Sequence, residues 1–166
     1  MEDRERALPV LPIYHEEDLN MSVQSQEKNM RKLAGLLGRD LSDIRGERED
    51  GPNGDKKVFL NTGKTFLRAL ARDLGFMEYK VSANPGGIAV SGDCSLIGMW
   101  ADSGLYVQLS QPCYQKENVL LYRTVCHIKD YSGGRNQYIT HRELESLSYS
   151  QFLDRLADGI CHERAA

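Results

Sequence analysis

The sequence has no long apolar run and no excess of positive charge, and each absence excludes a class of protein. No stretch approaches the roughly 18–20 consecutive apolar residues of a membrane span. The first residues, MEDRERALPVLPIYHEED, carry charge where a signal peptide needs an apolar stretch. We therefore expect a soluble cytoplasmic protein that makes no membrane contact. With 21 basic and 24 acidic residues the net charge is −3, so only a local basic patch could hold nucleic acid.

Cysteine is scarce, and its spacing does not indicate a shared site. The chain has four cysteines without C-x-x-C spacing: Cys94, Cys113, Cys126 and Cys161. We expect reduced, structural thiols. Cys126-His127 and Cys161-His162 match no standard zinc pattern, so we predict neither a metal site nor a cofactor. A Cys/His nucleophile pair, which would make the chain a thiol-dependent hydrolase, stays open because such partners meet in space and not in sequence.

A phosphate-binding loop is also absent, although Gly63-Lys64-Thr65 matches the end of one. The full pattern is G-x-x-x-x-G-K-[ST], and Val58 stands where its first glycine is required. We interpret the segment as a short strand at Val58–Leu60 followed by a helix that Asn61 or Thr62 caps. Specific binding of ATP or GTP is therefore not expected.

What is present is a set of elements that fits one domain, since 166 residues is a common domain length. Residues 1–20 combine charge with two prolines and predict an extended or flexible arm, and residues 21–166 predict one α+β domain. Helical spacing of apolar residues predicts a first helix over 23–37. A mobile loop is expected at 45–57, and a second helix near 64–74 that ends before a glycine.

After Gly75 the pattern changes to period two, which indicates strands. The segments are MEYKVS, GGIAVSGDCSLIGMW, GLYVQLSQ and NVLLYRTVCHIK. The turns between them are too short to join parallel strands. The predicted fold is α+β, with an antiparallel sheet of four to five strands in a meander and helices from before and after it packed on one face.

Two capping boxes, Thr140–Glu143 and Ser148–Gln151, predict helix starts after the sheet. The second would open a closing helix that ends at Gly159. Its apolar stripe comprises Tyr149, Phe152, Leu153, Leu156 and Ile160. Such a stripe predicts a structural helix lying across the sheet.

Two charged surfaces have no place in this expected core, so we predict that they bind a partner. They are a basic stripe on the second helix and an acidic loop before it: Lys64, Arg68, Arg72, Glu47, Glu49 and Asp50. The partner would be a protein or ribonucleoprotein complex. The alternative is a small nucleic-acid-binding module that uses the basic helix face together with sheet aromatics, such as Tyr106 and Tyr122, that stack on bases.

Three segments carry a resemblance to a group of proteins: Gly86–Gly92, Gly104–Val107 and Tyr131–Asn136. Over roughly 56–156 the chain resembles small proteins carried by conjugative elements and phages of gut Firmicutes. None of the segments is a catalytic signature. The resemblance implies a bacterial or phage mobile-element accessory protein, and that group includes antirestriction and anti-CRISPR inhibitors, which act mostly by binding. It implies a non-enzymatic inhibitor of a host defence complex such as a CRISPR nuclease.

Overall fold

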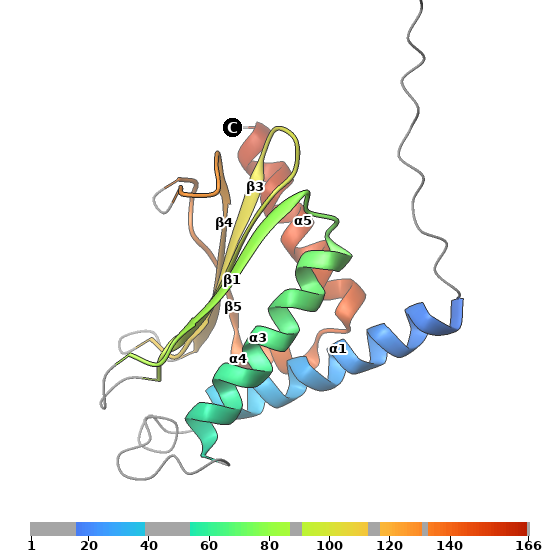
Figure 1. The fold of residues 1–166 in the computed structure, drawn as a ribbon, viewed down its shortest axis with the longest axis vertical. Coiled ribbons are helices and arrows are strands. Elements are labelled where there is room, and N and C mark those ends of the chain that lie inside the picture. Colours follow the sequence, from blue (N-terminus) through green and yellow to red (C-terminus); the bar gives the residue numbers. More distant parts are fainter. Residues whose placement is uncertain (1–15, 39–53, 87–90, 113–116, 131–132, 166) are drawn as a thin grey trace, which may run out of the picture.

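The fold is α+β, with a five-stranded antiparallel sheet covered on one face by helices (Figure 1). The computed structural model describes residues 16–38, 54–86, 91–112, 117–130 and 133–165. The helices are α1 (Glu16–Leu37), α3 (Asp55–Asp73), α4 (His141–Ser146) and α5 (Tyr149–Ala165). The strands are β1 (Glu78–Asn84), β2 (Asp93–Met99), β3 (Gly104–Ser110), β4 (Asn118–Val125) and β5 (Gln137–Thr140). Their order in the sheet is β1-β2-β3-β4-β5, which confirms the predicted meander.

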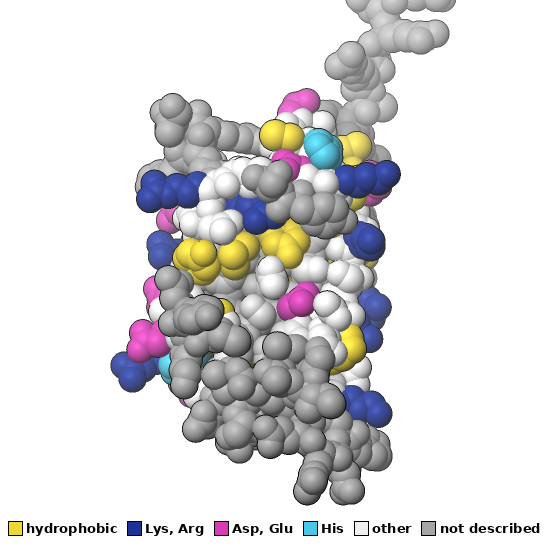
Figure 2. Space-filling model, turned by 90° about the vertical axis from the view of Figure 1, so that its left-hand side faces the viewer, with side chains coloured by type: hydrophobic (Ala, Val, Ile, Leu, Met, Phe, Trp, Pro, Cys, Tyr) yellow, Lys and Arg dark blue, Asp and Glu magenta, His cyan; other side chains and the backbone are white. Residues whose placement is uncertain are grey.

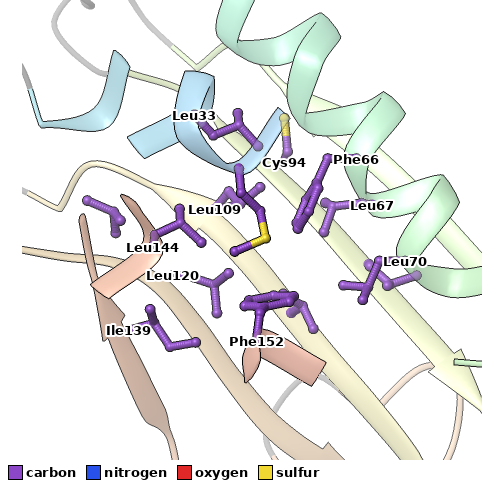
Figure 3. Close-up of a cluster of buried hydrophobic side chains, with 14 of the residues drawn as sticks. Leu33, Phe66, Leu67, Leu70, Cys94, Leu109, Leu120, Ile139, Leu144 and Phe152 are labelled. Carbon is purple, nitrogen blue, oxygen red and sulfur yellow. The ribbon is translucent and has the colours of Figure 1, made fainter. Parts of the chain in front are cut away.

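The core lies between the sheet and the helices. On β3, Leu105, Val107 and Leu109 are fully buried and point to the helical side, because alternate residues of a strand share a face. Figure 3 shows how side chains from α1, α3 and α5 meet those of the strands in one cluster. In the described parts of the chain, no helix is long and apolar enough to span a bilayer.

Helix α3 corrects the prediction of a strand at Val58–Leu60, since those residues lie inside it. The apolar run Val58–Leu60 is compatible locally with a strand and with a helix. The helix forms because it buries Phe59 on the same side as Phe66, Leu67 and Leu70. Gly63 is also internal, and a Cβ there would lie 2.7 Å from the Cys94 sulfur of β2. Gly63-Lys64-Thr65 is therefore a point of close helix–sheet approach inside a regular helix.

The predicted end of α3 is confirmed. The Gly75 N–H donates to the carbonyl of Arg72, and the Phe76 N–H donates to that of Ala71. Gly75 has a φ of +66°, a left-handed conformation that glycine adopts without a Cβ clash. Phe76 then packs over Gly98 of β2, where any side chain would overlap its ring.

Several element boundaries differ from the predictions. Residues 16–20, assigned to the arm, are helical in α1, and residues 55–57, assigned to the mobile loop, open α3. Residues 1–15 and 39–53 lie outside the described ranges. Helix α5 continues past Gly159, which is buried and faces Tyr122, so this glycine serves close packing and does not end the helix.

Both capping boxes are confirmed. The Glu143 N–H donates to Thr140 Oγ1 while Glu143 Oε2 accepts from the Thr140 N–H. Ser148 and Gln151 exchange the same pair of bonds at the start of α5. Thr140 also ends β5, the short fifth strand that the sequence left open, so β5 leads directly into α4.

Candidate functional site

The face of the sheet turned away from the helices is the candidate site. The strand registers place its side chains in two adjacent rows. We call these residues the open face: Lys80, Ile97, Tyr106 and Arg123 in one row, and Ser82, Ser95, Gln108, Leu121 and Tyr138 in the other. No helix or strand of the described ranges lies over them (Figure 2).

At the centre of the open face, Tyr106 and Arg123 form an organised pair. The Arg123 Cζ lies 4.6 Å from the centre of the Tyr106 ring, within the range of a cation–π contact. Tyr106 Oη donates to Gln108 Oε1 at 3.0 Å, and Arg123 Nη1 donates to Asn136 Oδ1 at 3.3 Å. These contacts hold an aromatic ring and a guanidinium in fixed positions on the open face.

Apolar groups adjoin this pair. Leu121 is half-buried beside Gln108, and its other neighbour, Tyr138, is 39% exposed. Figure 2 shows apolar side chains gathered in a band over the sheet, with basic side chains beside it and along both margins. At the β1–β2 end of the second row the side chains are small and polar. Ser82 and Ser95 lie there and share a hydrogen bond of 2.8 Å.

The charges of the open face are both positive, Lys80 and Arg123. The nearest acidic side chains of β1 and β2 on this side of the sheet, Glu78 and Asp93, lie one row beyond the open face at either end. Burial raises the pKa of the Asp93 carboxyl. The surface is therefore an apolar and aromatic band with two basic groups and an acidic margin.

The structure places the predicted basic stripe elsewhere. Arg68 and Arg72 are exposed on α3 and Lys64 is half-buried there, on the helical side of the sheet. The three side chains form no salt bridge with any described residue. The predicted acidic partner surface, Glu47, Glu49 and Asp50, falls outside the described residues.

Of the two aromatics proposed to stack on bases, only Tyr106 lies on the open face. Tyr122 is 1% exposed and points into the core, where its hydroxyl oxygen lies 3.2 Å from the Arg155 carbonyl oxygen and 3.1 Å from Gln137 Oε1, either of which can accept its proton. The prediction for Tyr122 is wrong because adjacent residues of β4 alternate between faces, and the sequence does not say which face is covered.

The described thiols do not form a catalytic pair with a histidine. Cys94 is fully buried, and its Sγ lies 3.5 Å from the Leu60 carbonyl oxygen. Burial, with a smaller contribution from Asp93, raises the pKa of the Cys94 thiol to about 12, so it is protonated near neutral pH. Cys126 is exposed, and Cys113 lies outside the described residues, as does the Cys161 side chain. Among the described side chains, no group of three or more His, Cys, Asp or Glu is placed to hold a metal ion.

Leu121 and Tyr138 were not predicted as surface residues of a shared patch. The period-two pattern of NVLLYRTV could have assigned Leu121 and Arg123 to one face of a strand. Their meeting with Tyr106 and Tyr138 depends on the registers of β3 and β5, which only the three-dimensional structure supplies. No protein-family model, curated protein or solved structure matches this chain.

Proposed function

We propose that this chain is a non-enzymatic accessory protein that binds a protein partner through the open face. The observation that carries the proposal is the Tyr106–Arg123 pair at the centre of the open face. Tyrosine and arginine are the residue types that, with tryptophan, dominate the energetics of protein interfaces. The adjoining Leu121 and Tyr138 supply apolar area, and the serines and Gln108 supply a polar surround.

A protein partner fits this face better than nucleic acid does. One side of the Tyr106 ring is already covered by Arg123, which reduces the ring surface left for a base. Half-buried Leu121 adds aliphatic area, and Glu78 and Asp93 border the rows with negative charge that would repel phosphates. A net charge of −3 gives no general attraction for a nucleic acid.

The partner that we propose is a subunit of a host defence complex such as a CRISPR nuclease, which the chain would inhibit by occupying its surface. This part of the proposal is based on the resemblance to mobile-element accessory proteins, whose inhibitors act mostly by binding. It is compatible with the buried, protonated state of Cys94, which disfavours a hydrolase built on that thiol.

Affinity capture with matched variants tests the proposal. The purified chain is immobilised and exposed to lysates of Firmicutes strains that have active CRISPR nucleases. Tyr106→Ala removes the central ring, and the double variant Lys80→Glu/Tyr138→Ala changes two exposed side chains of the open face. We expect the wild-type protein to retain a defence-complex subunit after nuclease treatment, and both variants to lose it.

The matched control is Lys28→Glu/Lys32→Ala, which changes two exposed side chains of α1 in the helical layer. It should retain the subunit as the wild type does. Equal retention by the open-face variants would show that another surface binds the partner. If the chain instead retains nucleic acid, and high salt releases it, the chain is a nucleic-acid-binding module and the proposed protein partner is wrong.

A further inference from the structure

Strand β1 lies at one edge of the sheet. It pairs with β2 through all seven residues, from Glu78 to Asn84, without a register shift, and no strand of the described residues pairs with its other edge. The strand contains no proline and no bulge, two of the devices by which proteins block an edge, although it does carry the charged side chains of Glu78 and Lys80. By contrast, the other edge strand, β5, has only four residues before α4 begins.

Large apolar side chains are exposed beside this edge. Met77 is 79% exposed and Tyr79 is 43% exposed, and they are two of the four most exposed large apolar residues in the described chain. Tyr79 lies opposite Gly98 and Val81 opposite Leu96, so this set of β1 side chains points to the helical side of the sheet. An added strand would cover part of this apolar surface.

The same side of the edge is flanked by positive charge from α3. Helix α3 packs on β1 and β2, and α3 and β1 lie side by side (Figure 1). Phe66 faces Tyr149 and Phe152 of α5, and Lys64 and Arg68 lie about half a turn further round the helix, away from α5. Gly63, the residue before Lys64, lies against Cys94 of β2, and Lys64 itself is half-buried, so Lys64 lies near the β1–β2 pair.

We propose that β1 binds an extended acidic segment of a partner protein as a sixth, added strand. Backbone groups of the segment would bond to the free edge, which is a known mode of peptide recognition. Its acidic side chains would face Lys64 and Arg68, which have no salt-bridge partner among the described residues.

This surface differs from the open face and rests on different observations. The open face presents side chains from the middle of the sheet, whereas strand addition uses the backbone of β1 with the α3 charges beside it. An experiment that contradicts one proposal therefore does not contradict the other.

A phage-displayed library of random twelve-residue peptides, selected on the purified protein, tests the proposal. We expect enriched peptides to be acidic and to alternate acidic with apolar residues. Binding of a synthetic peptide from the selection should weaken about tenfold or more in Lys64→Glu/Arg68→Glu, because like charges then meet. The control Lys32→Glu/Arg142→Glu reverses two exposed charges elsewhere and should bind as the wild type does.

Two further readouts identify the backbone contact. The peptide should slow amide hydrogen exchange in β1, and methylation of alternate peptide amides should abolish its binding. If Lys64→Glu/Arg68→Glu does not fold, Arg68→Gln/Arg72→Gln provides the charge test on exposed side chains alone. The proposal is overturned by a selection without enrichment, by enriched peptides that are not acidic, or by binding that leaves exchange in β1 unchanged.

Discussion

Among single residues, Gly63 and Cys94 show how closely α3 approaches the sheet. Glycine inside a helix normally costs about 1 kcal/mol relative to alanine. Here a Cβ at position 63 would lie 2.7 Å from the Cys94 sulfur and 3.1 Å from its Cβ. Because the strand backbone cannot move away without disturbing two ladders, the contact outweighs the helical preference for alanine.

Gly63→Ala should therefore lower the free energy of unfolding by about 1–3 kcal/mol through overpacking. Gly35→Ala is the matched control, since Gly35 is an exposed glycine of α1 with no atom within 4 Å of the added Cβ. It should raise the free energy of unfolding by about 0.5–1 kcal/mol. Urea denaturation measures both variants.

The double variant Gly63→Ala/Cys94→Ala tests the cause. Removal of the sulfur relieves the shortest contact, so the double variant should lose less stability than the sum of the single variants. Strict additivity, or a stabilising Gly63→Ala, would show that α3 is free to shift away from β2.

The Cys94 thiol should resist alkylation until strongly alkaline pH. Its pKa is raised from 9.0 to about 12, mainly by burial, so the neutral thiol is favoured in the folded state. A folded pKa above the unfolded one means that this contribution to stability is present below pH 9.0 and is lost as the pH rises toward about 12. The measurement is the rate of iodoacetamide labelling against pH, for a variant that retains Cys94 as its single thiol.

A second variant that retains only the exposed Cys126 provides the reference, and it should react at lower pH. Equal labelling of the two folded variants near pH 8 would contradict the burial of Cys94 and reopen the hydrolase alternative.

At the scale of elements, a buried polar network joins three helices. Gln26 Nε2 of α1 donates to the Phe66 carbonyl of α3 and to Tyr149 Oη of α5, each at 3.2 Å. Tyr149 Oη in turn donates to Asp73 Oδ2 at 2.6 Å. Burial and this bond to Asp73 raise the pKa of the Tyr149 hydroxyl. Gln26 and Tyr149 are almost fully buried, so their polar groups depend on one another.

Tyr149→Phe should destabilise the protein by about 1–3 kcal/mol, because it removes a bond to a carboxylate and one of the two acceptors of the Gln26 amide. Tyr138→Phe removes an exposed hydroxyl without a hydrogen-bond partner among the described residues. It should change stability by less than about 0.5 kcal/mol. Thermal or urea unfolding of the pair measures the difference, and similar values for both would contradict the network.

The closing helix α5 should depend on Leu156 more than on Leu153. Leu156 is fully buried, whereas Leu153 is only partly buried against the core. Leu156→Ala should cost about 2–5 kcal/mol, and Leu153→Ala clearly less. Urea denaturation midpoints compare the two variants. An unchanged midpoint for Leu156→Ala would show that α5 is peripheral to the core.

At the scale of the whole molecule, the sequence predicted what local chemistry determines. Short turn signals led to the antiparallel meander, and reciprocal pairs such as Thr140 with Glu143 led to the helix starts. The start of α3 was missed because Val58–Leu60 satisfies both a strand pattern and a helical one. Only the packing of Phe59 and Gly63 against other elements decides between them.

The open face could not be predicted for a related reason. Period two assigns residues of a strand to alternate faces, but the position of the helices decides which face stays uncovered. The pairing of Tyr106 with Arg123 further requires the register of β3 and β4. In the basic stripe of α3, Arg68 and Arg72 are exposed as expected, whereas Lys64 is half-buried. The position of the stripe beside β1 is a property of the tertiary structure.

The measurement that most directly tests binding through the open face is plaque formation by a phage on a host whose CRISPR nuclease targets it. The host expresses the wild-type chain, the Lys80→Glu/Tyr138→Ala variant, or a variant with all four cysteines replaced by alanine, each checked for folding. We predict that the wild-type and cysteine-free proteins restore plaques and that the open-face variant does not. Restored plaques with the open-face variant, and none with a well-folded cysteine-free protein, would contradict the proposal and indicate thiol chemistry.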